Sequence, residues 1–155
     1  MENKKITIII NTFKSDEKIH SCLDSISDEY KVVVVENSTN SEFKNKIEKK
    51  YSNVECILTG DNLGYAKGNN LGLSKVTSEY ALILNPDAQL HKDTLRNFFI
   101  TANKIKDFSI VGPANQDEFS KKEINSEKED FFEVNKLKGF AMFLKMEQFK
   151  EVGFF

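Results

Sequence analysis

Two stretches of the chain decide its fold: Asn62-Leu-Gly-Tyr-Ala-Lys-Gly-Asn-Asn-Leu-Gly-Leu73 and, after a polar link, Tyr80-Ala-Leu-Ile-Leu-Asn-Pro-Asp87. The first predicts a glycine-punctuated loop and helix, and the second predicts a buried strand that ends in a carboxylate. A short apolar run bounded by turn residues is typical of a central strand in a parallel sheet. Because open α/β sheets bind ligands beyond the carboxyl ends of such strands, Asp87 is expected at the functional edge.

Apolar runs and amphipathic segments alternate along the first two thirds of the chain. Strands are predicted over residues 5–10, 32–35, 53–58, 80–85 and 108–111. The intervening helices include one capped by Ser15, one with a capping box of Thr39 and Glu42, and one over residues 92–106. Such alternation implies βαβ units and a mainly parallel sheet, so the predicted fold class is α/β.

The last third of the chain breaks this alternation. Residues 115–130 are polar and aperiodic, which predicts a surface excursion. Strands at 131–134 and 138–145, followed by a helix at 146–152, would add an antiparallel edge to the sheet.

Gly64, Gly68 and Gly72 recur every four residues in the first stretch. On a helix they would share one side and leave a strip of bare backbone. Since glycine costs about 1 kcal/mol relative to alanine inside a helix, the strip predicts that another group approaches closely.

The composition is that of one soluble globular domain, with 155 residues, 39% of them hydrophobic, and a net charge of −2. This charge argues against a nucleic-acid partner, and no apolar run is long enough to cross a membrane. The chain opens without a signal-peptide pattern. Cys22 and Cys56 are interpreted as buried thiols, which favours the cytoplasm. His20 and His91 have no positioned partner in the sequence and are interpreted as surface residues.

Three polar clusters, at residues 11–13, 36–39 and 85–87, each follow a predicted strand. Each cluster alone fits a helix cap or a turn, but parallel strands would bring them to one crevice. Asn85-Pro86-Asp87 predicts a stiff turn that presents Asp87 outward. Such a carboxylate suits Mg²⁺ or Mn²⁺, which takes its remaining ligands from water and substrate phosphates. The sequence contains no Walker or Rossmann signature.

In its motifs the chain resembles a family 2 glycosyltransferase of the GT-A fold, closest in character to bacterial rhamnosyltransferases. The matching segments, which cover nearly the whole chain in the family's order, are residues 10–13, 34–39, 62–72, 84–87, 139–142 and 151–154. The resemblance implies a mainly parallel twisted sheet flanked by helices, with an antiparallel C-terminal edge. It also implies a single domain at 1–155, with a nucleotide-binding half at 1–112 and the start of an acceptor-binding half at 113–155.

The resemblance also implies roles for individual residues. Thr12 and Phe13 would line a nucleoside pocket, and Glu36 would contact the base. Asp87 would meet the metal bound to the diphosphate, whereas Asn85 replaces the first Asp of the commoner Asp-x-Asp pattern and weakens that position as a ligand. The other residues implied at the nucleotide-sugar site are Asn37, Asn62, Gly64, Lys67, Asn69 and Asn85, and those beside the sugar and acceptor are Gly139 and Phe140.

The implied activity is metal-assisted transfer of a sugar, with inversion, from a nucleotide-diphosphate donor to an acceptor hydroxyl. The acceptor would be a glycan or a lipid-linked molecule in cell-surface polysaccharide synthesis, at the inner face of the membrane. The family's catalytic base lies in a Glu-Asp motif expected beyond Phe155, so the chain resembles a truncated enzyme that binds nucleotide but transfers sugar weakly or not at all. Glu127, Glu129 and Asp130 belong to a charge run and are interpreted as a solvated face.

Two alternatives remain open from the sequence. A nucleotidyltransferase would usually carry a glycine-rich basic loop after the first strand, and Asn11-Thr-Phe-Lys14 contains no glycine. A non-catalytic module that holds nucleotide or a partner would need no catalytic base.

Overall fold

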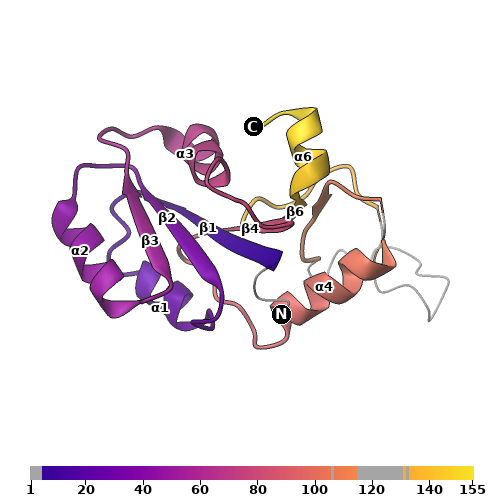
Figure 1. The fold of residues 1–155 in the computed structure, drawn as a ribbon, viewed down its shortest axis with the longest axis horizontal. Coiled ribbons are helices and arrows are strands. Elements are labelled where there is room, and N and C mark those ends of the chain that lie inside the picture. Colours follow the sequence, from indigo (N-terminus) through magenta and orange to yellow (C-terminus); the bar gives the residue numbers. More distant parts are fainter. Residues whose placement is uncertain (1–4, 106, 115–130, 132) are drawn as a thin grey trace.

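The computed structural model describes residues 5–105, 107–114, 131 and 133–155, and its centre is a six-stranded sheet (Figure 1). The strand order is β3-β2-β1-β4-β6-β5. The strands are β1 (Ile6–Thr12), β2 (Lys31–Glu36), β3 (Val54–Leu58), β4 (Tyr80–Leu84), β5 (Ile110–Val111) and β6 (Ala141–Lys145). Strands β3, β2, β1 and β4 are parallel, and β6 runs antiparallel to both of its neighbours, β4 and β5. The predicted mainly parallel sheet with an antiparallel C-terminal edge is confirmed.

Helices cover both faces of the sheet. They are α1 (Ile19–Asp24), α2 (Ser41–Lys50), α3 (Gly64–Leu73), α4 (Thr94–Lys104) and α6 (Met146–Val152). The buried side chains of α1, α2 and α4 form one core cluster with alternate strand residues, and those of α3 and α6 form a second cluster with the others. Two buried faces explain why β1, β2 and β4 are continuous apolar runs. No helix in the described part of the chain is long and apolar enough to span a membrane.

Phe143 holds the antiparallel edge against the parallel strands. Its ring stacks on Tyr80 and Phe98 at centroid distances of 4.9 and 5.0 Å and meets the edge of Phe99 at 5.9 Å. Because Phe143 lies in β6 and Tyr80 in β4, these contacts reinforce the backbone pairing of the two strands.

Several predicted boundaries are wrong. The first helix begins at Ile19 without a side-chain cap, because Ser15 donates its hydroxyl hydrogen bond to the carbonyl of Phe13 and a turn follows. Asp16 and Glu17 therefore precede the helix. The cap of α2 is Asn40, whose Oδ1 accepts from the amide of Phe43 at 2.9 Å, and not Thr39.

The structure of the C-terminal third agrees in part with the prediction. Helix α6 has the predicted bounds, whereas β5 and β6 are shorter than predicted and β1 extends two residues further. Residues 131, 133 and 134 form no strand. The two neighbours of β6 in the sheet are β4 and β5. The predicted excursion at 115–130, with its charge run, lies outside the described residues.

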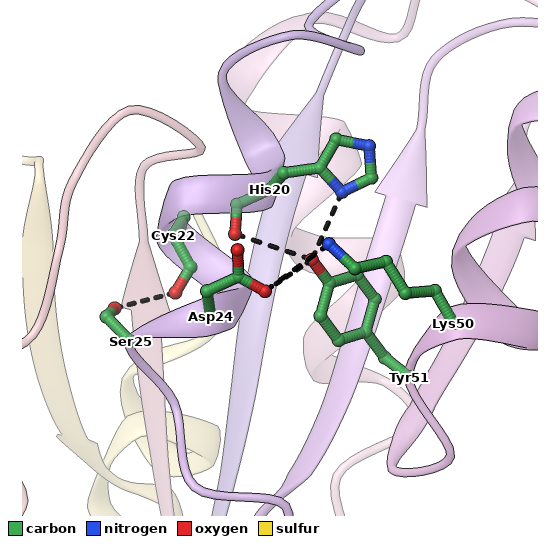
Figure 2. Close-up of polar contacts among 6 residues, drawn as sticks. All are labelled: His20, Cys22, Asp24, Ser25, Lys50 and Tyr51. Atoms are coloured by element: carbon green, nitrogen blue, oxygen red, sulfur yellow. Dashed lines mark hydrogen bonds and ion pairs between the residues drawn. The ribbon is translucent and has the colours of Figure 1, made fainter.

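Both cysteines are free and buried, as predicted, and burial raises the pKa of each thiol to about 12. The interpretation of His20 as a residue without a partner is wrong. Its Nδ1 lies 3.1 Å from the Tyr51 hydroxyl, which donates to Asp24 Oδ1 at 2.8 Å (Figure 2). These contacts join α1 to the end of α2. They could not be predicted from the sequence, because the bonded residues are up to 31 positions apart.

Candidate active site at the carboxyl edge of the sheet

The carboxyl ends of β1, β2 and β4 lie at one edge of the sheet. Thr12 is paired in register with Glu36, which places the ends of β1 and β2 side by side. Leu84 pairs with Ala141 at the start of β6, so the antiparallel strand brings Gly139 and Phe140 to this same edge. The predicted clusters therefore converge, and the edge also includes the predicted acceptor residues.

A cavity of about 710 Å³ opens between the loops that follow β1 and β2. Its lining includes Phe13, Lys14, Glu36 and Ser38. Glu36 is buried, and its Oε2 has no hydrogen-bond partner among the described residues. Burial raises the pKa of this carboxyl above its usual value, while hydrogen bonds from Ser38 and the Lys14 backbone oppose the rise. Thr12 is also buried, and its Oγ1 is likewise unpaired in the described structure.

Asn37 and Asn11 join the two strand ends to the start of α3. The Asn37 amide nitrogen donates to Asn11 Oδ1 and to the Thr12 carbonyl, and Asn37 Oδ1 accepts from the backbone amide of Leu63. Asn11 in turn donates to the carbonyls of Gly64 and Tyr65, each at 3.1 Å. Asn37, a predicted site residue, thus has its side-chain amide engaged within the protein.

The glycine strip of α3 faces the sheet and is not a wall of the crevice. A Cβ added at Gly68 would meet the Asn11 side chain, and one at Gly72 would lie 2.5 Å from Ile9 Cγ2. The close approach predicted from the spacing is therefore the contact of the helix with β1. Gly64 differs from these two glycines. It is exposed, it is the first residue of the helix, and its φ is +73°.

The remaining predicted residues differ in exposure. Asn62 and Lys67 are exposed, and Asn62 Oδ1 accepts from the Gly64 amide at 2.9 Å. Asn69 is fully buried, and neither atom of its amide group has a hydrogen-bond partner within the described part of the chain. Asn85 is half-buried, and Asp87 is exposed just beyond the end of β4.

The residues at this edge fit a metal ion that is shared with a substrate. Asp87 supplies one exposed carboxylate, and the described residues contain no group of three His, Cys, Asp or Glu that could hold an ion. Mg²⁺ and Mn²⁺ tolerate few protein ligands when water and phosphate oxygens supply the others. A single carboxylate therefore suits an ion that arrives with a diphosphate.

Two residues of this edge had no individual role in the predicted site: Asn11, which was included only in the polar cluster at residues 11–13, and Tyr65. Asn11 directly follows the apolar run of β1, and that position was the available signal. Tyr65 donates its hydroxyl hydrogen bond to the carbonyl of Gly139 at 2.6 Å. No local pattern could reveal that contact, because the two residues are 74 positions apart.

Lys14 adopts a left-handed backbone conformation, with φ of +52°, at the rim of the cavity. This region costs most residues about 1–2 kcal/mol, and asparagine tolerates it better. We expect Lys14→Asn to be more stable by about 1 kcal/mol than Lys14→Ala, as measured by urea unfolding. Both variants lose the ammonium that lies 5.2 Å from the Phe13 ring centroid, so the comparison isolates the backbone effect. Equal stability of the two would contradict it.

Comparison with known proteins identifies the family. The chain matches the model of glycosyl transferase family 2 over residues 7–150, and it belongs to this family. The low-salt glycan biosynthesis hexosyltransferase Agl10 of Haloferax volcanii is 34% identical over 112 residues, which are 70% of this chain and 36% of that protein. The poly(ribitol-phosphate) β-N-acetylglucosaminyltransferase TarP of Staphylococcus aureus is 27% identical over 118 residues, again 70% of this chain and 36% of that protein.

Solved structures confirm the GT-A fold. The mannosyltransferase PcManGT from Pyrobaculum calidifontis, in complex with GDP-Man and Mn²⁺, superposes with a TM-score of 0.75 at 19% identity, over 97% of this chain and 47% of that one. Residues 1–349 of S. aureus TarS superpose with a TM-score of 0.71 at 19% identity, over 96% of this chain and 49% of that one. The chain thus spans about a third of these curated relatives and about half of these solved chains.

Proposed function

We propose that this chain forms the donor-binding side of an inverting glycosyltransferase that uses a nucleotide-diphosphate sugar. One observation carries the proposal. Thr12, Glu36 and Asn69 come from three separate segments, are almost fully buried, and hold polar atoms without a hydrogen-bond partner among the described residues. Of the three, Glu36 lines the cavity. Buried polar groups are normally paired, so unpaired ones at this edge support a ligand or water that completes them.

We propose one role for each of the following predicted residues. Phe13 is exposed at the cavity and offers a ring face to the base, and Glu36 accepts a hydrogen bond from a base N–H. Thr12 Oγ1 and the Asn69 amide are assigned to the nucleotide sugar. Lys67 and Asn62, both exposed, are assigned to the phosphates and the sugar, and Asn85 orients the turn that carries Asp87.

We assign Asp87 to a Mg²⁺ or Mn²⁺ ion that arrives with the donor. When bound, such an ion offsets the negative charge that builds on the departing diphosphate. The exposure of Asp87 and the absence of other clustered ligands among the described residues support an ion shared with the substrate. PcManGT, of like fold, was solved with Mn²⁺ and GDP-Man, and TarS with UDP-GlcNAc.

The acceptor side begins, in this proposal, at Gly139 and Phe140, and residues 1–112 form the nucleotide-binding half. We assign no catalytic base to a described residue, since Glu36 is buried and Asp87 is assigned to the metal. We therefore expect the chain to bind nucleotide and to transfer sugar weakly or not at all. A non-catalytic nucleotide-binding module would behave alike, and robust donor turnover by these 155 residues would exclude it. The free buried thiols support a cytoplasmic setting.

Calorimetric titration tests the proposal. The 155-residue chain is titrated with UDP, GDP, dTDP and CDP, with Mn²⁺ and with EDTA, and then with UDP-GlcNAc, GDP-mannose and dTDP-rhamnose. We expect one base to bind at least tenfold more tightly than the others and to need Mn²⁺ for full affinity. Glu36→Gln should weaken that binding and reduce the preference for one base. Failure of every nucleotide to bind would overturn the proposal.

A further inference from the structure

We propose that Tyr65 is a positioning residue that ties the Gly139–Phe140 turn to the start of α3 and so fixes the sugar side of the donor site. The inference rests on the proposed function, because it assigns that turn to the sugar. It adds a residue and a contact to a site otherwise built from strand ends.

The contact itself is short and specific. The Tyr65 hydroxyl donates to the Gly139 carbonyl at 2.6 Å. A Cβ added at Gly139 would lie 3.2 Å from this hydroxyl, so a side chain at position 139 would press on the contact. Partial burial raises the pKa of Tyr65 above its usual value, and the Asn69 side chain opposes that rise.

Both ends of the contact are anchored in the fold. The Tyr65 carbonyl accepts from Asn11, and Asn11 is bonded to Asn37 at the end of β2. On the other side, the Phe140 carbonyl accepts from the backbone amide of Asn85 at 2.9 Å. The Tyr65 hydroxyl thus completes a series of hydrogen bonds that runs from β2 through β1 and α3 to the end of β4.

Tyr65 is the most replaceable member of this series. Tyr65 is 46% exposed and Phe140 is 40% exposed, so buried contacts contribute little to holding the Gly139–Phe140 turn in place. Residues 133–139, which lead into the turn, are all exposed as well. The Asn37–Asn11 link joins β2 to β1, and Asn85 directly follows β4, which pairs with β6, so backbone pairing already holds these strand ends in place. Loss of the Tyr65 hydroxyl should therefore loosen the turn and leave the strand ends unchanged.

This difference gives a specific expectation for ligands. A nucleoside diphosphate would occupy the cavity at Phe13 and Glu36 and would not need the turn. A nucleotide sugar extends further, toward Gly139 and Phe140, and would use it. The Tyr65 hydroxyl should therefore affect the additional affinity that the sugar supplies and have little effect on the affinity for the nucleotide.

The test compares Tyr65→Phe with Tyr51→Phe in the full 155-residue chain. The control also removes a bonded tyrosine hydroxyl, but one that joins α1 to α2 and lies outside the series. Calorimetry with Mn²⁺ gives Kd values for UDP, GDP, dTDP and CDP, and for UDP-GlcNAc, GDP-mannose and dTDP-rhamnose. NMR hydrogen exchange follows the Asn85 amide, which bonds to Phe140.

We expect Tyr65→Phe to weaken nucleotide-sugar binding about three- to tenfold, to change nucleotide binding less than twofold, and to speed exchange at Asn85 several-fold. Tyr51→Phe should change none of these. An equal loss for nucleotide and nucleotide sugar, or faster exchange without a sugar-specific loss, would overturn the positioning role. If the wild-type chain binds no nucleotide, the proposed function fails. Unchanged exchange at Asn85 in Tyr65→Phe would separately show that the Tyr65–Gly139 hydrogen bond does not hold the turn.

Discussion

Replacing Asp87 by asparagine is expected to remove the metal-dependent part of nucleotide binding. Asparagine keeps the size of the side chain and one oxygen but loses the negative charge that a hard divalent cation requires. Asp87 is the exposed carboxylate of the Asn85-Pro86-Asp87 turn, and no cluster of three metal-binding side chains occurs in the described residues to replace it. The Kd for the preferred nucleoside diphosphate with Mn²⁺ should rise on the order of 10- to 100-fold.

The same Kd measured with EDTA should stay within about twofold of the wild-type value, because the proposed base contacts, Phe13 and Glu36, do not involve Asp87. Asp28→Asn is the matched control: it makes the same chemical change at an exposed residue in the loop that precedes β2, at the opposite edge of the sheet. If Asp87→Asn bound nucleotide equally well with Mn²⁺, the ion would have other ligands and the assignment would be wrong.

The sequence predicts those features of the fold that depend on neighbouring residues. β1, β2 and β4 are apolar on both faces, so their runs are continuous and easily recognised. Helix α4 buries Leu95, Phe98, Phe99 and Ala102 as its spacing predicts. The convergence of the polar clusters at one edge of the sheet was also predictable, because it follows from parallel strands and the polar residues after them.

Features that depend on distant residues could not be predicted in this way. The spacing of Gly68 and Gly72 indicates a close approach, but only the folded chain shows that Asn11 and Ile9 are the approaching groups. Asn37 and Asn69 are both asparagines near the site, yet one is fully hydrogen-bonded within the protein and the other is unpaired among the described residues. Free and engaged side chains therefore cannot be told apart by residue type, and this distinction limits a prediction of the site.

Phe143→Ala is expected to produce the largest loss of stability, about 3–5 kcal/mol, as is typical when a buried phenylalanine is truncated. The Phe143 side chain is completely buried and packs against Tyr80, Phe98 and Phe99, so its removal leaves a cavity lined by rings from β4 and α4. Since small domains are stable by about 5–15 kcal/mol, the variant should be close to unfolding at 37 °C. Urea unfolding followed by circular dichroism measures the loss.

The matched control for this prediction is Phe140→Ala, the same substitution three positions earlier and just before β6 begins. Phe140 is 40% exposed, so its truncation removes less buried surface and should cost about 1 kcal/mol or less. The contrast follows from the position of β6 between β4 and β5, where Phe143 binds the antiparallel edge to the parallel strands. Equal losses of stability for the two variants would show that the antiparallel strands β6 and β5 do not depend on this aromatic cluster. β6 would then be held mainly by its backbone hydrogen bonds.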